Sequence, residues 1–136
     1  MPPTASQAYE SAGSGDSVLG WKVDPEQRAE LLQQFPPRFE RIVADHVTLK
    51  FGAGRQAPLP EAVVGEIVGR ADDGKGVECM VVRIGGTTDR PDGSTYHITW
   101  SLEKGRRAKE SNDVIRQFGW TGIELPVPIM LQPARF

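Results

Sequence analysis

Two copies of one short pattern constrain this chain more than any other feature. His46 to Leu49 and His97 to Trp100 both read His-x-Thr-x with apolar x, and they hold the only two histidines of the sequence. In a strand, residues i and i+2 point to the same face. Each histidine is therefore expected beside its threonine, with the apolar residues turned the other way into a core. Two such strands facing one another would place two imidazoles and two hydroxyls around one cavity, which suits acid–base chemistry on a phosphate.

Length, charge and cysteine content limit the class of protein. The chain has 136 residues and a formal net charge of −2. This length predicts one domain with a core of its own. The charge argues against a bulk, non-specific nucleic-acid binder but leaves room for a local basic patch. The single cysteine, Cys79, lies in an apolar run and is interpreted as a small buried hydrophobe.

Motifs for several other chemistries do not occur in the sequence. It contains no C-x-x-C, no H-E-x-x-H and no acidic loop that would suggest a metal. No apolar run has the length of a membrane span, and no signal-peptide pattern is visible at the start. We therefore expect a cytoplasmic or nuclear protein that is monomeric and works without a cofactor.

Breaks in the pattern predict where the elements begin and end. Residues 1–16 are rich in Ser, Ala, Gly and Pro, which predicts a flexible tail ahead of a single domain at 17–136. Asp24 and Pro25 are typical of a helix start, and Pro36-Pro37 should end that helix. We expect strands at 18–23, 45–51, 62–71, 77–84, 96–102 and 127–132, helices at 24–35 and 109–118, and a connector or short extended piece at 39–43.

The order of these elements predicts the fold class. The strands at 62–71 and 77–84 are joined by a turn at 72–76 and should form a hairpin. Few helices accompany many short strands. The sequence therefore predicts an α+β protein built around a curved antiparallel sheet.

Three stretches resemble one known family. They are Asp45 to Phe51, Tyr96 to Trp100, and Ala108 to Asn112, which reads Ala-Lys-Glu-Ser-Asn. The paired motifs resemble those of the 2H phosphoesterase superfamily. The closer resemblance is to the cyclic phosphodiesterase domain of plant and fungal tRNA ligases and its stand-alone relatives. It covers residues 18–136 and implies two pseudo-symmetric lobes around a central cleft.

Two features depart from the wider superfamily. The motifs are 97 − 46 = 51 residues apart, which is short, and a hairpin is expected between them where many 2H proteins have a helix. This compact spacing suits the tRNA-ligase-like branch. The sequence also has no phosphate-binding G-x-x-x-x-G-K-[ST] motif. In RNA repair the chain would therefore supply one step only.

The motif residues suggest how water would open a 2′,3′-cyclic phosphate. One neutral histidine, His46 or His97, would take a proton from water, and the other, protonated, would give one to the leaving ribose oxygen. The hydroxyls of Thr48 and Thr99 would donate hydrogen bonds to the non-bridging oxygens, where charge develops. This chemistry needs no metal. The resemblance implies a 2′-phosphate as product, and which histidine is the base stays open.

Basic residues near the motifs are further candidates, for substrate binding. By alternation, the lysine after the first motif points to the same face as the histidine. The basic run after the second motif would contact RNA phosphates or form a solvated loop. Ser111 and Asn112, in the family-like stretch, are interpreted as helix caps. The candidates are Lys50, Lys104, Arg106, Arg107 and Lys109.

The aromatic residues near the motifs allow two interpretations, base stacking or core packing. Tyr96 and Trp100 fall on the strand face opposite His97, so core packing is expected for both. The choice stays open for Trp21 and Trp120.

Other substrates and one other class of function remain as alternatives. Within the enzyme class, the alternative substrates are a cyclic oligonucleotide, a 2′,5′-linked oligomer and ADP-ribose cyclic phosphate. A non-catalytic module that holds RNA ends is the second class. Because a binding-only protein has no need of both imidazoles, the intact pair favours an enzyme acting on an RNA end or a small cyclic nucleotide.

Overall fold

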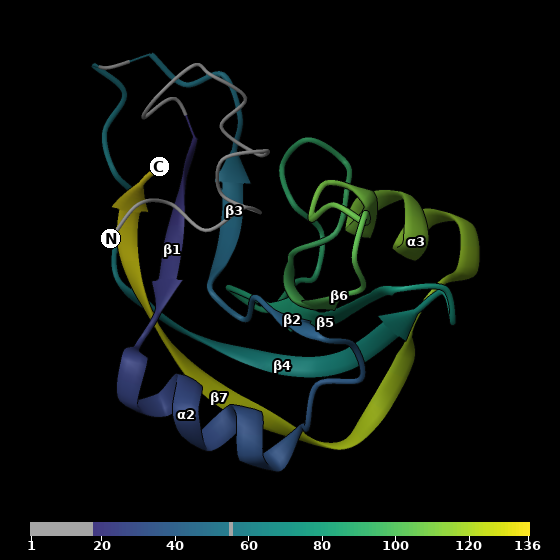
Figure 1. The fold of residues 1–136 in the computed structure, drawn as a ribbon. Coiled ribbons are helices and arrows are strands. Elements are labelled where there is room, and N and C mark those ends of the chain that lie inside the picture. Colours follow the sequence, from purple (N-terminus) through teal and green to yellow (C-terminus); the bar gives the residue numbers. More distant parts are fainter. Residues whose placement is uncertain (1–17, 55) are drawn as a thin grey trace.

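The protein is an α+β fold in which one curled antiparallel sheet of seven strands forms a half-barrel (Figure 1). A computed structural model describes residues 18–54 and 56–136, so the tail expected at 1–16 lies outside the described residues. The strand order is β2-β6-β5-β4-β7-β1-β3. In chain order the elements are β1 (Leu19–Val23), α2 (Pro25–Gln34), β2 (Arg41–Ile42), β3 (His46–Lys50), β4 (Val63–Asp72), β5 (Val77–Arg83), β6 (His97–Leu102), α3 (Glu110–Phe118) and β7 (Thr121–Arg135).

Helix α2 begins and ends where the sequence predicts. The Asp24 carboxylate accepts a hydrogen bond from the Gln27 N–H at 3.1 Å, and Pro25 occupies the first turn. The helix ends at Gln34, two residues before Pro36-Pro37. Leu31 is its buried residue and anchors it to the sheet.

The predicted hairpin of β4 and β5 is confirmed. The two strands pair antiparallel from Glu66 opposite Arg83 to Asp72 opposite Glu78. In the turn, the Asp72 carboxylate accepts from the Gly74 N–H at 2.6 Å, and Gly74 takes a φ of 67° that favours glycine. The strand expected at 127–132 is wrong in extent, because β7 runs from Thr121 to Arg135 and changes partner from β4 to β1 along its length.

Two apolar clusters lie on opposite faces of the sheet. The larger contains Leu31 of α2 with Val47, Ile98 and Trp100, the apolar residues of the two motifs. The smaller packs α3 against β4 and β5. Figure 1 shows the two helices on opposite sides of the sheet. The prediction that Tyr96 and Trp100 pack in the core is confirmed. Trp21, for which the choice was open, is a core residue as well.

Between β2 and β3 the chain changes partner and links the two ends of the sheet. The Ala44 N–H donates to the Thr99 carbonyl in β6 at 2.9 Å, and one residue later the Asp45 carbonyl accepts from the Val23 N–H in β1 at 3.0 Å. Ala44 makes this bend with a φ of 44°, a strained conformation for a residue with a side chain. Arg28 of α2 holds the bend through the Ala44 carbonyl at 2.8 Å.

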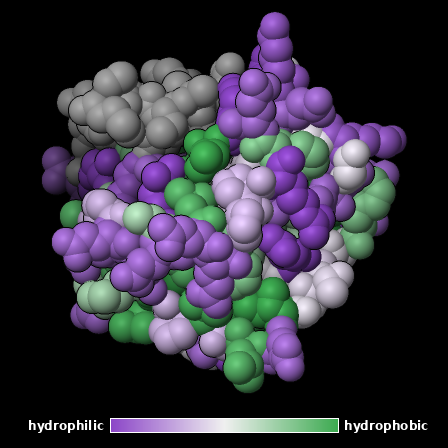
Figure 2. Space-filling view, turned by 60° about the horizontal axis from the view of Figure 1, so that its bottom comes forward, coloured by the Kyte–Doolittle hydropathy of each residue, from purple (hydrophilic) through white to green (hydrophobic). Residues whose placement is uncertain are grey.

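The surface is mixed in polarity. On the face that Figure 2 shows, apolar side chains form patches separated by polar ones. The most exposed large apolar residues, Leu125 and Val64, lie on β7 and β4. Among the described residues, no helix has the length and apolar content needed to cross a bilayer.

A buried carboxylate fastens the connector ahead of β2 to the sheet. Glu78 has no exposed surface and accepts from the Ser101 hydroxyl at 2.7 Å and the Arg38 backbone N–H at 3.0 Å. Arg70 donates to its other oxygen at 3.2 Å. Because buried charges must be paired and hydrogen-bonded, these contacts make the carboxylate tolerable inside the protein.

We expect Glu78→Ala to lower the free energy of unfolding by about 2–4 kcal/mol, because it leaves these donors without their acceptor. Urea denaturation followed by circular dichroism measures the change. Glu66→Ala is the matched control, since its ion pair with Arg83 on the same hairpin is about 40% exposed and should be worth at most ~1 kcal/mol. Equal effects of the two substitutions would contradict this account of Glu78.

Candidate active site

The two His-x-Thr strands lie beside each other although they stand near opposite ends of the sheet order. Cα atoms of β3 approach Cα atoms of β6 within 8 Å, because the bend at Ala44 joins the two edges. Val47 and Ile98 belong to one core cluster. By alternation, the histidines and threonines of both strands therefore project to the opposite face of the sheet, the face that carries α3.

His46 is held by a carboxylate and an aromatic ring. Its Nδ1 lies 3.1 Å from Oδ2 of Asp45, and its ring stands 4.6 Å from the Phe136 ring, centroid to centroid. The side chain is 3% exposed. Because an ionised carboxylate only accepts, Nδ1 carries the proton and donates it to Asp45. A proton transfer to or from a substrate would then use Nε2.

The ionisation of Asp45 follows from its neighbours. Burial raises its pKa, but hydrogen bonds from His46 and from Lys22, the latter at 2.6 Å, together with their charge, outweigh burial and lower the pKa to about 2. Asp45 is therefore a carboxylate at neutral pH. Lys22 also stands over the Phe136 ring, 5.0 Å from its centroid, which ties the four groups together.

His97 is held by a neutral acceptor. Its Nδ1 lies 2.8 Å from the backbone carbonyl of Thr95, and the residue is 6% exposed. A carbonyl only accepts, so Nδ1 carries the proton here as well. Both rings are thus fixed through Nδ1, His46 against a carboxylate and His97 against a backbone carbonyl.

The two threonines of the motifs are buried. The Thr99 hydroxyl is 2.8 Å from the Ser111 hydroxyl and 3.3 Å from the Ala108 carbonyl. These contacts join β6 to the start of α3 and fix the direction of the Thr99 side chain. Thr48 lies in β3 beside His46 and is likewise almost inaccessible.

The interpretation of Ser111 and Asn112 as helix caps is wrong. Helix α3 is capped at Lys109, which makes no side-chain capping hydrogen bond. Ser111 is drawn instead to the buried hydroxyl of Thr99, since a buried hydroxyl needs a partner. Sequence reasoning also missed Asp45, which directly precedes the first histidine and could have been found from that position.

The basic candidates occupy different environments. Lys50 is exposed at the end of β3 and lines a cavity of about 550 Å³ with Phe51 and Asp92. Arg106 is bound to the Asp73 carboxylate at 2.8 Å, and it also contacts Glu110 and the Lys75 carbonyl, so it stabilises the turn between β4 and β5. The exposed ones are Lys104, Arg107 and Lys109.

A second cavity lies against Thr95, two residues before His97. It has a volume of about 480 Å³, and its wall includes Thr95, whose carbonyl holds His97. Asp92 lines this cavity and also the one beside Lys50, so the loop that carries it separates the two. Within residues 18–54 and 56–136, no group of three or more His, Cys, Asp or Glu side chains is arranged to hold a metal ion.

The charge of Asp45 gives a stability prediction with a defined sign. Its pKa in the folded protein, about 2, lies below its ordinary value of 3.8. The ionised form therefore stabilises the fold above pH 3.8, by about 2 kcal/mol, and this contribution is lost as the pH falls through 2.

We therefore expect the difference in unfolding free energy between the wild type and Asp45→Asn to shrink between pH 5 and pH 2. Urea denaturation at each pH measures it. Asp113→Asn is the control, because its ion pair with Arg116 is mostly exposed and contributes little at any pH. A difference that stays constant for Asp45→Asn would contradict the assigned ion pair.

Comparisons with known proteins identify no relative of this chain. A scan against family models, a search of curated proteins and a search of solved structures each found no match.

Proposed function

We propose that the protein hydrolyses a 2′,3′-cyclic phosphate, at an RNA end or on a nucleotide, to a 2′-phosphate without a metal ion. One observation carries the proposal. Two neighbouring strands present His and Thr to the same face of the sheet, and each imidazole is fixed through Nδ1 to an oxygen acceptor. Two positioned imidazoles supply the base and the acid that such a hydrolysis requires.

The reaction is an in-line displacement at phosphorus. Water attacks the phosphorus opposite the 3′-oxygen and gives a proton to Nε2 of the neutral histidine. The bond between phosphorus and the 3′-oxygen breaks, and the leaving oxygen takes a proton from the protonated histidine. The products are a 2′-phosphate and a free 3′-hydroxyl. Proton exchange with solvent returns both rings to their starting states.

The contacts of the two rings favour one assignment of roles. The Asp45 carboxylate beside His46 stabilises a positive charge on that ring, as an ionised neighbour does. At the same ring nitrogen His97 is held by the Thr95 carbonyl, a neutral acceptor. We therefore assign His46 as the acid that protonates the 3′-oxygen and His97 as the base that activates water.

The proposal also assigns a role to the two threonines and a superfamily to the fold. Thr48 would donate a hydrogen bond to a non-bridging phosphate oxygen as charge builds up on it, and Thr99 would do the same by turning its hydroxyl proton away from the Ala108 carbonyl. The proposal includes membership of the 2H superfamily, with two lobes about a cleft. It is supported by the two motifs and by the contact of Ser111, from the third family-like stretch, with Thr99.

Direct assay of the reaction tests this function. We expect the wild type to turn over adenosine 2′,3′-cyclic monophosphate in EDTA and to release adenosine 2′-monophosphate. His46→Ala and His97→Ala should each lower kcat by ~10²–10⁴-fold, the usual value of one proton transfer. Product analysis by chromatography separates the 2′- and 3′-monophosphates.

The threonine variants need a matched control. Thr48→Val and Thr99→Val keep the side-chain shape and remove the hydroxyl, and Thr121→Val does the same at an exposed position on β7. Turnover should fall for the first two and stay unchanged for the third. Circular dichroism checks that all variants fold. Near-wild-type turnover by either histidine variant would refute the two-histidine mechanism.

The pH dependence tests the assignment of the two rings. A base and an acid acting together give a bell-shaped profile of kcat/KM. In Asp45→Asn the alkaline limb should move to lower pH by about one unit, because the acid loses its stabilising charge. If His46 is the base, the acidic limb will move instead, which would reverse the assignment.

A further inference from the structure

We propose that the cavity beside His97 binds the base of the nucleotide whose phosphate is attacked, and that it selects a base with an exocyclic amino group. This inference rests on the proposed function, because it assigns part of the same substrate. The cavity has about 480 Å³, which is within the range of small-ligand pockets.

Two contacts connect this cavity to the histidine and threonine of β6. Thr95 lines it and holds His97 through its carbonyl at 2.8 Å. Asn112 also lines it, and the preceding residue, Ser111, holds the Thr99 hydroxyl at 2.8 Å. The proposal therefore places the phosphate at His97 and Thr99 and the base of the same nucleotide in the adjoining cavity.

Trp120 supplies a stacking surface at the side of the cavity. It follows Gly119, which ends α3 with a φ of 72°, and its indole is 41% exposed. A Cβ on Gly69 would stand 2.2 Å from the six-membered ring, so the absence of a side chain there lets the indole rest on the β4 backbone. The ring is thus held in place with part of its surface open, as base stacking requires.

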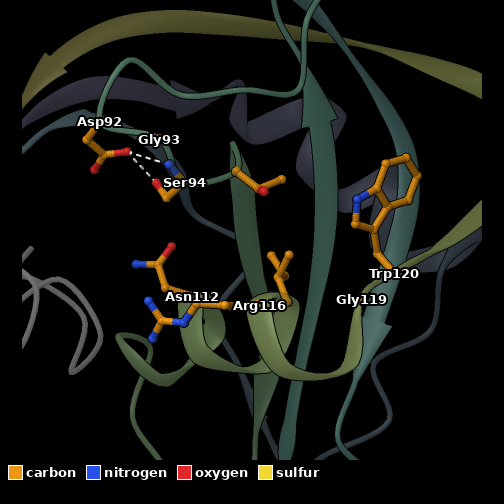
Figure 3. A pocket seen from close by; sticks show the side chains of 9 residues that line it. Asp92, Gly93, Ser94, Asn112, Arg116, Gly119 and Trp120 are labelled. Atoms are coloured by element: carbon orange, nitrogen blue, oxygen red, sulfur yellow. Dashed lines mark hydrogen bonds between the residues drawn. The ribbon is translucent and has the colours of Figure 1, made fainter.

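Asn112 supplies a hydrogen-bonding group on the wall formed by α3. Figure 3 shows it with Arg116 facing the loop of Asp92 and Ser94, while Trp120 stands on the other side. The Asn112 Oδ1 is buried and has no hydrogen-bond partner among the described residues. A donor from a ligand would therefore add a hydrogen bond without breaking one. The amide of asparagine commonly reads the amino group of a base in this way.

The opposite wall carries the Asp92 carboxylate, which is held in place by its neighbours. Asp92 accepts from the Ser94 N–H at 2.9 Å and from the Ser94 hydroxyl at 2.5 Å, and it forms an ion pair with Arg90 at 3.0 Å. The hydrogen bond from Arg90 keeps the pKa of Asp92 well below its usual range. A carboxylate has acceptor capacity beyond these contacts, so Asp92 offers an amino group of a base a second acceptor.

A matched pair of substrates tests the selection. Cytidine and uridine 2′,3′-cyclic monophosphates differ at C4, where cytosine has an amino group and uracil a carbonyl. We expect kcat/KM to be about 5–100-fold higher for the cytidine substrate, the size of one good base contact. Methyl riboside 2′,3′-cyclic phosphate, which has no base, should be the poorest substrate.

Variants separate stacking from reading of the amino group. Trp120→Ala should lower kcat/KM for both nucleotides by about 5–100-fold, mainly through KM, and leave the base-free substrate unchanged. Asn112→Ala should remove the preference for cytidine. Phe118→Ala is the control, because Phe118 is also exposed but does not line this cavity. Trp120→Phe keeps a ring on Gly69 if the alanine variant fails to fold.

Binding without turnover gives an independent readout. Trp21 and Trp100 are buried, so Trp120 is the exposed one of the three tryptophans. Cytidine 2′-monophosphate should quench the fluorescence of the wild type more than methyl riboside 2′-phosphate does. In Trp120→Phe this difference between the two ligands should disappear. Specific quenching would support the base site even if no cyclic phosphate is hydrolysed. In that case only the proposed function fails. Equal kcat/KM for all three substrates, together with no specific quenching, would overturn the base site.

Discussion

The bend at Ala44 is the constraint on which the arrangement of the site depends. Immediately before it the chain pairs with β6, and immediately after it with β1, so one short segment links the two ends of the sheet. The bend requires a positive φ at a residue that is not glycine, which is costly. Arg28 offsets this cost through hydrogen bonds to two consecutive carbonyls. Without this link the two His-x-Thr strands would stand at separate edges.

The two histidines are alike in sequence and unlike in surroundings. His46 has a carboxylate and His97 a carbonyl at the same ring nitrogen. An acid–base pair needs two titratable groups in different environments, and these contacts differ. The pairing of Thr99 with Ser111 extends this arrangement to α3, and through it to Asn112 and the neighbouring cavity. The packing of β6 against α3 thus fixes the half of the candidate site that carries His97 and Thr99.

Local patterns predicted the parts of the fold that depend on neighbouring residues. Asp24 caps α2 as its position indicates, and the alternation of β6 places Trp100 in the core. Contacts between residues far apart in the chain have no local sequence pattern from which they could be predicted. The predicted strand at 127–132 lies between Pro126 and Pro133, and β7 continues through both of them although proline usually marks the end of a strand. The contact of Phe136 with His46 depends on the closed sheet and could not be predicted from spacing.

The central claim is that both histidines act on one phosphate. Because the chain has only two histidines, nitrogen-15 NMR of the imidazoles reports on each without ambiguity. We would titrate the labelled protein with a nucleoside 2′-monophosphate, the proposed product, at constant pH. The account predicts that the Nε2 signals of both rings shift together with one dissociation constant, and that Asp45→Asn changes the response of His46 more than that of His97. Shifts in only one ring, or in neither, would contradict a shared phosphate site.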